Sequence, residues 1–261
     1  MNLIQLKKST LEIELIDGPQ GAPRSPLVFL HEGLGSVAMW RSRDGFWPAQ
    51  VCAATGRAGV VYSRRGYGQS SAIADVRDAN RLAPDYMHRE AWEVLPELLG
   101  VLGMERPVLL GHSDGGTIAL LHAARHPLSA CVVMAPHVMV EDVSITSIQA
   151  AREAYVHGHL RERLAKFHQD VDGAFWQWND VWLSEGFRSF DIRGLCRDIS
   201  APILALQGVD DAYGSLAQIE DIAPSSGLIE RHALAACCHS PHRDQPQQTL
   251  ALIEAFLRDK P

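Results

Sequence analysis

A serine, a histidine and two neighbouring aspartates have the types and the order along the chain that nucleophilic catalysis requires. Ser113 is the central residue of a Gly-x-Ser-x-Gly pentapeptide. Asp210 and Asp211 follow a later apolar run, and His239 follows the last one. A serine hydroxyl becomes a nucleophile when a base lies within hydrogen-bond reach and an acid orients that base. The sequence therefore predicts attack by Ser113, with His239 as the base and one of the two aspartates as the acid.

The pentapeptide lies between two segments of different character. An apolar run that begins at Pro107 is typical of a buried strand, and residues 117–126, rich in Ala and Leu, are typical of a helix. A sharp turn between them would push the Ser113 hydroxyl out above a parallel sheet, and the flanking glycines would relieve crowding. Ordinary glycine-rich turns can carry the same pentapeptide, so the predicted nucleophile depends on the other two loops.

The elements that must position these residues alternate between apolar runs and helical patterns. This alternation predicts right-handed crossovers and a mostly parallel sheet that is covered on both faces. Strands are expected at 27–30, 59–62, 130–135, 203–206 and, as a short one, 228–232. Helices are expected at 46–55, 84–102, 215–222 and 245–257, with a kink or break at Pro96. Alternating patterns at 3–7 and 10–16 predict an edge hairpin, and the glycines and prolines of 17–26 predict a loop.

The interval 136–200 interrupts this alternation. It is helix-like and carries three of the six tryptophans within seven residues: Trp176, Trp178 and Trp182. We expect an inserted helical cap here, over the strand ends of a core formed by 1–135 and 201–261. For any one of these aromatic residues, we expect packing in the core of the cap rather than contact with substrate.

The composition limits the possible partners. The net charge of −7 and the absence of long basic runs argue against a nucleic acid or an anionic membrane and favour a small-molecule substrate. Five scattered cysteines, none in a Cys-x-x-Cys pair, predict neither a disulfide framework nor a zinc ribbon. No segment has the pattern of a signal peptide or the length of a membrane span. These features together predict a cytoplasmic protein.

Over nearly its whole length the chain resembles the α/β-hydrolase superfamily. The resemblance rests on the strand pattern, the pentapeptide, the order serine, acid, histidine, the Arg-Gly-Tyr-Gly-Gln-Ser loop at 65–70 and the Asp-Gln-Pro at 244–246. It implies an α/β-hydrolase fold with a mostly parallel eight-stranded sheet and a cap, and an activity that needs no cofactor and no metal. In the superfamily the acid usually lies three residues after a glycine, which favours Asp211 over Asp210. His239 is favoured over His242, although Cys238 stands where glycine is usual.

The resemblance also implies an oxyanion hole and shows where this chain departs from the pattern. The two donors would be the backbone N–H groups of Asp114 and Gly33. Glu32 replaces a glycine that is common before that loop, and Asp114 replaces an apolar or amide residue that often follows the nucleophile. Carboxylates at these positions oppose a developing oxyanion unless they are paired or turned away. We hypothesise that Glu32 pairs with Arg64 and so fixes the oxyanion loop.

Three other classes of protein compete with this interpretation. Residues 33–38 read Gly-x-Gly-x-x-Ala, a variant of the dinucleotide fingerprint, and Arg64 could contact the 2′-phosphate of NADP. Gly45 and Pro48 interrupt the helix that this fingerprint needs. A metal hydrolase is conceivable from the twelve histidines, but none has a carboxylate pattern typical of zinc enzymes. A non-catalytic ligand-binding hydrolase fold usually lacks a member of the triad, and here none is missing.

Within the superfamily the residues do not separate the reaction types. Esterases, thioesterases, carbon–carbon bond hydrolases and lyases share the same triad, and residues 31–36 have some likeness to the oxyanion loop of the menaquinone-pathway lyases. The prediction is a serine hydrolase that cleaves a carboxylic ester or related acyl bond of a small molecule. A carbon–carbon bond hydrolase or lyase is the alternative.

Overall fold

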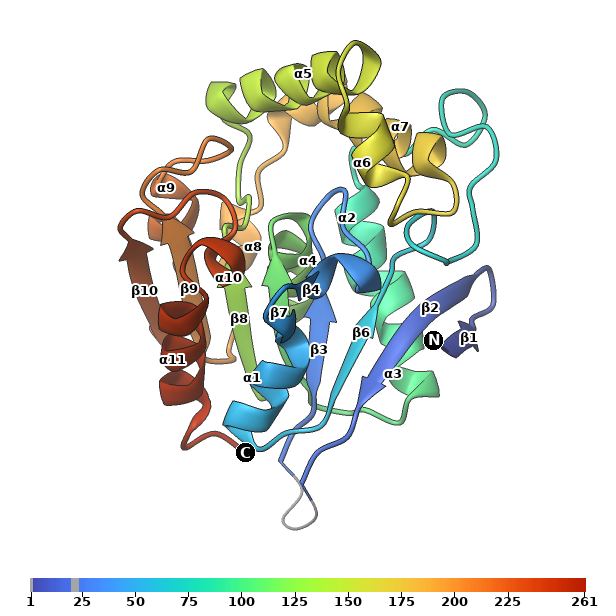
Figure 1. Cartoon of the computed structure of the whole chain (residues 1–261). Coiled ribbons are helices and arrows are strands. Elements are labelled where there is room, and N and C mark those ends of the chain that lie inside the picture. The colour runs from blue at the N-terminus through green and yellow to red at the C-terminus, as the bar shows by residue number, and fades with distance from the viewer. Residues whose placement is uncertain (1, 20–23) are drawn as a thin grey trace.

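The computed structural model describes residues 2–19 and 24–261. Met1 and residues 20–23 of the predicted loop 17–26 lie outside the described residues. Eight strands form the main sheet: β1 (Asn2–Gln5), β2 (Thr10–Ile16), β3 (Leu27–Leu30), β6 (Gly59–Tyr62), β7 (Val108–His112), β8 (Ala130–Met134), β9 (Ile203–Gly208) and β10 (Ile229–Leu234). Their order is β1-β2-β6-β3-β7-β8-β9-β10. The pairs from β6 to β10 are parallel, and β1 and β2 run antiparallel at one edge (Figure 1). The predicted α/β-hydrolase fold with a mostly parallel eight-stranded sheet is confirmed.

Helices cover both faces of the sheet because the inner strands are apolar on both sides. On one face α1 (Trp47–Thr55) and α11 (Pro246–Leu257) pack over alternate strand residues such as Phe29 and Val61. On the other face α3 (Leu95–Val101) and α4 (Asp114–Ala123) pack over Val28, Val60 and their neighbours. Successive strand side chains point to opposite faces, so every inner residue is buried against a helix layer. Each such Val, Leu or Phe contributes about 1.5–3 kcal/mol of burial free energy.

The predicted helix 84–102 differs most from the observed structure. It is divided into α2 (Tyr86–Arg89), a π-helical turn (Glu90–Val94) and α3. Pro96 has no N–H to donate to the carbonyl of Trp92, four residues earlier, and the turn before it widens. The predicted break therefore takes the form of a widened turn. The predicted helix 215–222 shortens to α9 (Ala217–Glu220), and the last strand begins and ends one to two residues later than expected.

Helices from between β8 and β9 lie over the ends of the strands. These are α5 (Asp142–Val156), α6 (Leu160–Leu164) and α7 (Val171–Trp182), which Figure 1 shows above the sheet. A 3-10 turn (Glu185–Ser189) and α8 (Arg193–Cys196) lead back to β9. Stacking of Tyr155 on Phe175, with ring centroids 3.6 Å apart, joins α5 to α7. The division into a core and a cap at residues 136 and 200 stays a prediction.

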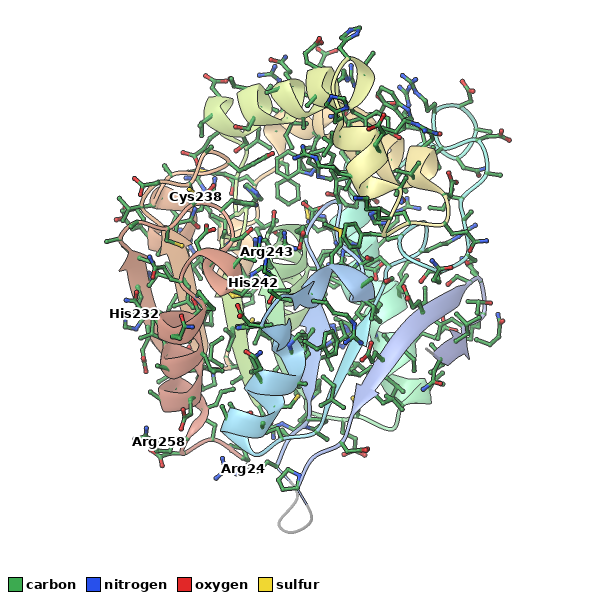
Figure 2. All side chains as sticks on the ribbon, in the orientation of Figure 1. Arg24, His232, Cys238, His242, Arg243 and Arg258 are labelled. Atoms are coloured by element: carbon green, nitrogen blue, oxygen red, sulfur yellow. The ribbon has the colours of Figure 1, made fainter. Side chains whose placement is uncertain are left out.

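Two further predictions from the sequence concern disulfides and membrane-spanning segments. All five cysteines are free thiols; four are buried, and Cys238 lies at the surface (Figure 2). Within residues 2–19 and 24–261, no helix combines the length and the apolar character needed to cross a bilayer.

Candidate active site

A strained turn carries Ser113 between β7 and α4. Its backbone has φ 53° and ψ −121°, a conformation that is rare for a residue with a side chain and frequent at functional turns. The two glycines of the pentapeptide are sterically required. A Cβ on Gly111 would lie 2.1 Å from the carbonyl oxygen of Gly115, and a Cβ on Gly115 would lie 2.2 Å from that of Leu30. The helix begins directly after Ser113, three residues earlier than its sequence pattern indicates.

Ser113, His239 and Asp211 form one hydrogen-bonded chain. Asp211 Oδ2 lies 2.8 Å from His239 Nδ1, and His239 Nε2 lies 2.9 Å from Ser113 Oγ. Burial of Asp211 opposes its ionisation, but the hydrogen bond and charge of His239 hold the pKa of this carboxyl below its ordinary value. Because the carboxylate accepts the Nδ1 proton, Nε2 is free to accept the serine proton. Asp210 is exposed and takes no part in this chain.

Further hydrogen bonds orient the carboxylate of Asp211. Gln207 Nε2 donates to Oδ2 at 2.7 Å, and the backbone N–H of Tyr213 donates to Oδ1 at 2.7 Å. The Asp211 side chain is fully buried. These contacts fix the acid before the histidine is charged, which is the form of pre-organisation that such a triad needs.

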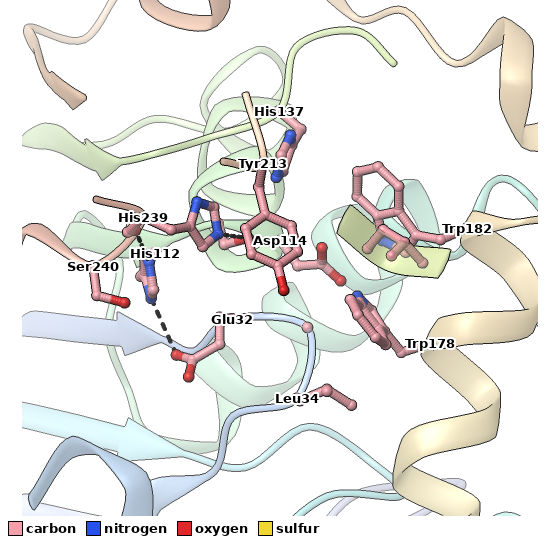
Figure 3. Close-up of a pocket in the computed structure, with 13 residues that line it drawn as sticks. Glu32, Leu34, His112, Asp114, His137, Trp178, Trp182, Tyr213, His239 and Ser240 are labelled. Carbon is pink, nitrogen blue, oxygen red and sulfur yellow. Dashed lines mark hydrogen bonds and ion pairs between the residues drawn. The ribbon is translucent and has the colours of Figure 1, made fainter. Parts of the chain in front are cut away.

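The Asp114 side chain is turned into the protein behind the nucleophile. Tyr86 donates its hydroxyl proton to Asp114 Oδ2 at 2.5 Å, and Arg64 Nη2 lies 3.8 Å from the same oxygen. Burial raises the pKa of Asp114, and the Arg64 charge acts in the opposite direction. Figure 3 shows this carboxyl beside Trp178 and Trp182, away from His239. Oδ2 of this carboxyl is therefore partnered by Tyr86 and Arg64, and the side chain is turned away from the base.

The hypothesised pair between the Glu32 and Arg64 side chains is wrong. Arg64 Nη2 donates to the backbone carbonyl of Glu32 at 3.0 Å, while its charge faces Asp114. The Glu32 carboxylate points the other way along the strand ends and contacts His112 Nδ1 at 3.1 Å and Arg243 at 3.7 Å. Arg64 still holds the loop that follows β3, but it does so through the main chain.

His112, the residue before the nucleophile, connects Glu32 to the loop that carries the base. Its Nε2 lies 2.7 Å from the carbonyl oxygen of His239, and its Nδ1 faces the Glu32 carboxylate (Figure 3). Both ring nitrogens of His112 therefore have an oxygen partner. Burial opposes ionisation of Glu32, but the hydrogen bond and charge of His112 hold the pKa of that carboxyl well below its ordinary value. This role of His112 was not predicted from the sequence.

A pocket of about 230 Å³ opens at the triad. Aromatic side chains form much of its wall: His137, Trp178, Trp182 and Tyr213. Both expected oxyanion residues, Gly33 and Asp114, also line it. Burial lowers the pKa of His137 to about 3, so this ring stays neutral although it lies 5.7 Å from the ring of His239. The tryptophans come from α7, so the helices above the sheet close the pocket. The donor roles of the Gly33 and Asp114 N–H groups stay predictions.

Comparison with known proteins identifies the family. Residues 27–252, well over half of the chain, match the sequence profile described as the alpha/beta hydrolase family. The chain belongs to the alpha/beta hydrolase family. The expected resemblance is thereby confirmed.

Relatives of this α/β-hydrolase include esterases and a lactonase. The bifunctional esterase/perhydrolase DCH of Acinetobacter calcoaceticus is 25% identical over 229 residues, which are 74% of this chain and 76% of the relative. The enol-lactonase structure from Burkholderia xenovorans LB400 has a TM-score of 0.72 at 18% identity and covers 99% of this chain and 100% of its own. A carboxylesterase structure from the thaumarchaeon Nitrososphaera gargenis has a TM-score of 0.74 at 17% identity, with coverage of 98% and 97%. At these identities the structural matches establish the fold.

The dinucleotide fingerprint does not have its usual structural setting in this α/β-hydrolase. Residues 33–38 lead into a 3-10 turn (Val37–Trp40) and the short strands β4 (Arg41–Ser42) and β5 (Gly45–Phe46). The helix α1 begins only at Trp47, so the helix that the fingerprint needs does not open at these glycines. The NADP interpretation therefore lacks the geometry on which it depended. In the described part of the chain, no three His, Cys, Asp or Glu side chains gather in a way that could hold a metal ion.

Gly33→Ala is expected to lower kcat for an ester substrate by about 10²-fold or more. A Cβ at this position would lie 2.1 Å from Trp178 Nε1, so the loop and the Trp178 ring must move apart, and the Gly33 N–H is expected to move with the loop. Loss of one oxyanion donor typically costs about 10²–10³ in kcat. Gly100→Ala is the matched control, because a Cβ there meets no described atom within 4 Å. Equal kcat values for the two variants would remove Gly33 from the oxyanion hole.

Glu32→Gln is expected to reduce the loss of unfolding free energy that the protein shows as the pH falls below about 4.5. The folded-state pKa of Glu32 lies below its ordinary value of 4.5, so its ionised form stabilises the fold above that value. This contribution is lost as the pH falls from about 4.5 through the folded-state pKa. Urea denaturation at pH 7 and at successive values below 4.5 measures the effect. An equal loss of unfolding free energy in wild type and variant would contradict a stabilising contact between His112 and the ionised Glu32.

Proposed function

We propose that this protein is a serine hydrolase that cleaves a carboxylic ester, or a related acyl bond, of a small molecule. The observation that carries the proposal is the hydrogen-bonded chain from Asp211 through His239 to Ser113 in the wall of a pocket. A histidine bonded to a buried carboxylate on one nitrogen and to a serine on the other is arranged to take the serine proton. Glu32, which lines the pocket, and Arg64, which donates to the Glu32 carbonyl, support the site.

The mechanism follows from these contacts. Ser113 Oγ attacks the substrate carbonyl carbon while His239 Nε2 takes the hydroxyl proton, and Asp211 stabilises the charged imidazole. The N–H groups of Gly33 and Asp114 hold the oxyanion, each contributing about 2.7–4 kcal/mol. The bond to the leaving alkoxide then breaks, and His239 gives this group the proton. Water attacks the acyl-enzyme with His239 again as base, which releases the carboxylic acid and restores Ser113.

The pocket favours a small acyl group with apolar or aromatic character. Its volume of about 230 Å³ is below the range of about 300–1,000 Å³ that is typical of drug-sized ligands. Trp178, Trp182 and Tyr213 offer ring faces, and charged side chains border it only where they are paired. We expect kcat/KM to fall as the acyl chain of an ester lengthens beyond this volume.

A panel of substrates on wild type and Ser113→Ala tests the proposal. It comprises p-nitrophenyl acetate, butanoate and decanoate, a matched thioester and a vinylogous diketone. The expected result is turnover of the short esters that depends on Ser113. Turnover of the diketone with none of the esters would favour the carbon–carbon hydrolase alternative, and no turnover in the whole panel would contradict the acyl-transfer function.

A further inference from the structure

A buried histidine from the segment between α6 and α7 contacts two loops of the core. This residue, His168, is 5% exposed. The backbone N–H of Gly68 donates to its Nδ1 at 3.0 Å, and the Gln169 N–H donates to the Gly68 carbonyl at 2.9 Å. Its Nε2 lies 3.0 Å from the carbonyl oxygen of Leu34. One side chain therefore joins the 65–70 loop to the loop that follows β3.

The two partners of His168 determine which of its ring nitrogens carries the proton. A backbone N–H can only donate, so Nδ1 accepts from Gly68. A carbonyl oxygen can only accept, so Nε2 carries the proton and donates it to Leu34. Burial lowers the pKa of His168, which favours this neutral ring. His168 is therefore a neutral bridge that accepts at one end and donates at the other.

The Leu34 carbonyl belongs to the first of two peptide groups that lead to the predicted oxyanion donor. The N–H of the same peptide group, on Gly35, donates to the carbonyl oxygen of Glu32 at 3.0 Å. The Glu32 carbonyl in turn shares its peptide group with the Gly33 N–H. In a trans peptide the C=O and the N–H point in opposite directions, so a donor on the carbonyl fixes the direction of the N–H. Successive hydrogen bonds of this kind also polarise one another.

Two side chains of the core reach the same carbonyl oxygen of Glu32. His31 Nδ1 lies 2.7 Å from it, and Arg64 Nη2 lies 3.0 Å from it. These contacts hold one end of the peptide group without His168. Loss of His168 should therefore displace the Gly33 N–H in part rather than remove it from the oxyanion hole.

Trp178 makes a second contact between the helices above the sheet and this loop. Its ring lies against Gly33, where a Cβ would come within 2.1 Å of Nε1, and Figure 3 shows the ring facing the loop that carries Leu34. The helices that close the pocket therefore meet the loop at two adjacent residues. We propose that His168 is a positioning residue of the hydrolase, which fixes the Gly33 N–H for the oxyanion through the two intervening peptide groups. The inference rests on the proposed function and on the predicted oxyanion donor.

Three variants of His168, assayed with p-nitrophenyl acetate, separate its two contacts. His168→Ala removes both, and we expect kcat to fall by about tenfold with KM changed by less than about twofold, because a displaced oxyanion donor weakens binding of the transition state alone. His168→Gln can place an amide N–H near the position of Nε2 and so restore the contact with Leu34. His168→Asn can place an amide oxygen near the position of Nδ1, which keeps the contact with Gly68 but does not reach Leu34. We expect kcat within about threefold of wild type for the glutamine variant and close to that of His168→Ala for the asparagine variant.

Tyr155→Phe is the matched control for a hydrogen bond lost among the helices above the sheet. The Tyr155 hydroxyl donates to Asp172 at 2.6 Å, within the same group of helices, so kcat should stay close to wild type. Thermal melts of all four variants show whether each one folds. The glutamine and asparagine variants each keep a partner for one of the two buried backbone groups, so both should fold.

Several results would overturn the positioning role of His168. They are wild-type kcat in His168→Ala, equal kcat in the glutamine and asparagine variants, a change confined to KM, or an equal loss of kcat in Tyr155→Phe. Each of these contradicts the role of His168 alone, because it is measured against a wild type that hydrolyses the ester. A wild-type protein without ester turnover would contradict the proposed function, and this inference with it.

Discussion

Ser113→Ala should lower kcat/KM for a short aryl ester by about 10⁴-fold or more, to the level left by binding and the oxyanion donors alone. The substitution removes Oγ, the atom that lies 2.9 Å from His239 Nε2, and leaves no group that can form the acyl-enzyme. The fold should survive, because alanine keeps the Cβ that serine already places in this strained turn. Initial rates with p-nitrophenyl acetate and a thermal melt measure the two effects.

Ser240→Ala is the matched control for that experiment. Ser240 also lines the catalytic pocket, but its hydroxyl makes no hydrogen bond to another described residue. Its loss should change kcat/KM by less than threefold. A Ser113→Ala protein that keeps more than a tenth of wild-type activity would place the nucleophile elsewhere.

Asp211→Asn is expected to reduce kcat by about 10⁴-fold, with a much smaller change in KM. An asparagine amide directed at His239 Nδ1 donates a proton where the carboxylate accepted one, so the ring takes the tautomer whose Nε2 is already protonated. That nitrogen then cannot accept the Ser113 proton. Stopped-flow or steady-state rates at pH 7–8 show the effect directly.

Asp210→Asn separates the two aspartates that the sequence offers. The Asp210 side chain is exposed and Asp211 is buried against His239, so the first substitution should leave kcat close to wild type. A large loss in Asp210→Asn with little loss in Asp211→Asn would reverse the assignment of the acid.

The strands were the most predictable part of this molecule. Residues 10–16, 27–30 and 59–62 form strands with the predicted limits, because continuous or alternating apolar runs between turn residues leave few other arrangements. The helix limits were less predictable. Pro96 indicated an interruption, but a widened turn and a break produce the same residue pattern.

The positions of the candidate site residues followed from chain order, whereas their side-chain contacts did not. Parallel strands bring their C-terminal ends to one edge, so Ser113, Asp211 and His239 were expected to meet there. Glu32 and Arg64 also meet at that edge, but the direction of each long side chain depends on neighbours distant in sequence. The role of His112 was not predicted because any residue can occupy its place in the pentapeptide, and its two partners, Glu32 and the His239 carbonyl, are distant in sequence.

The contact between His112 and the main chain of His239 has a mechanical consequence. The loop after β10, which holds the base, is joined to the residue just before the nucleophile by a hydrogen bond of 2.7 Å. His112 ends β7, a central strand buried on both faces, so the base shares the stiffness of that strand although it stands on a loop. We therefore expect the distance between His239 Nε2 and Ser113 Oγ to change little when the loop moves.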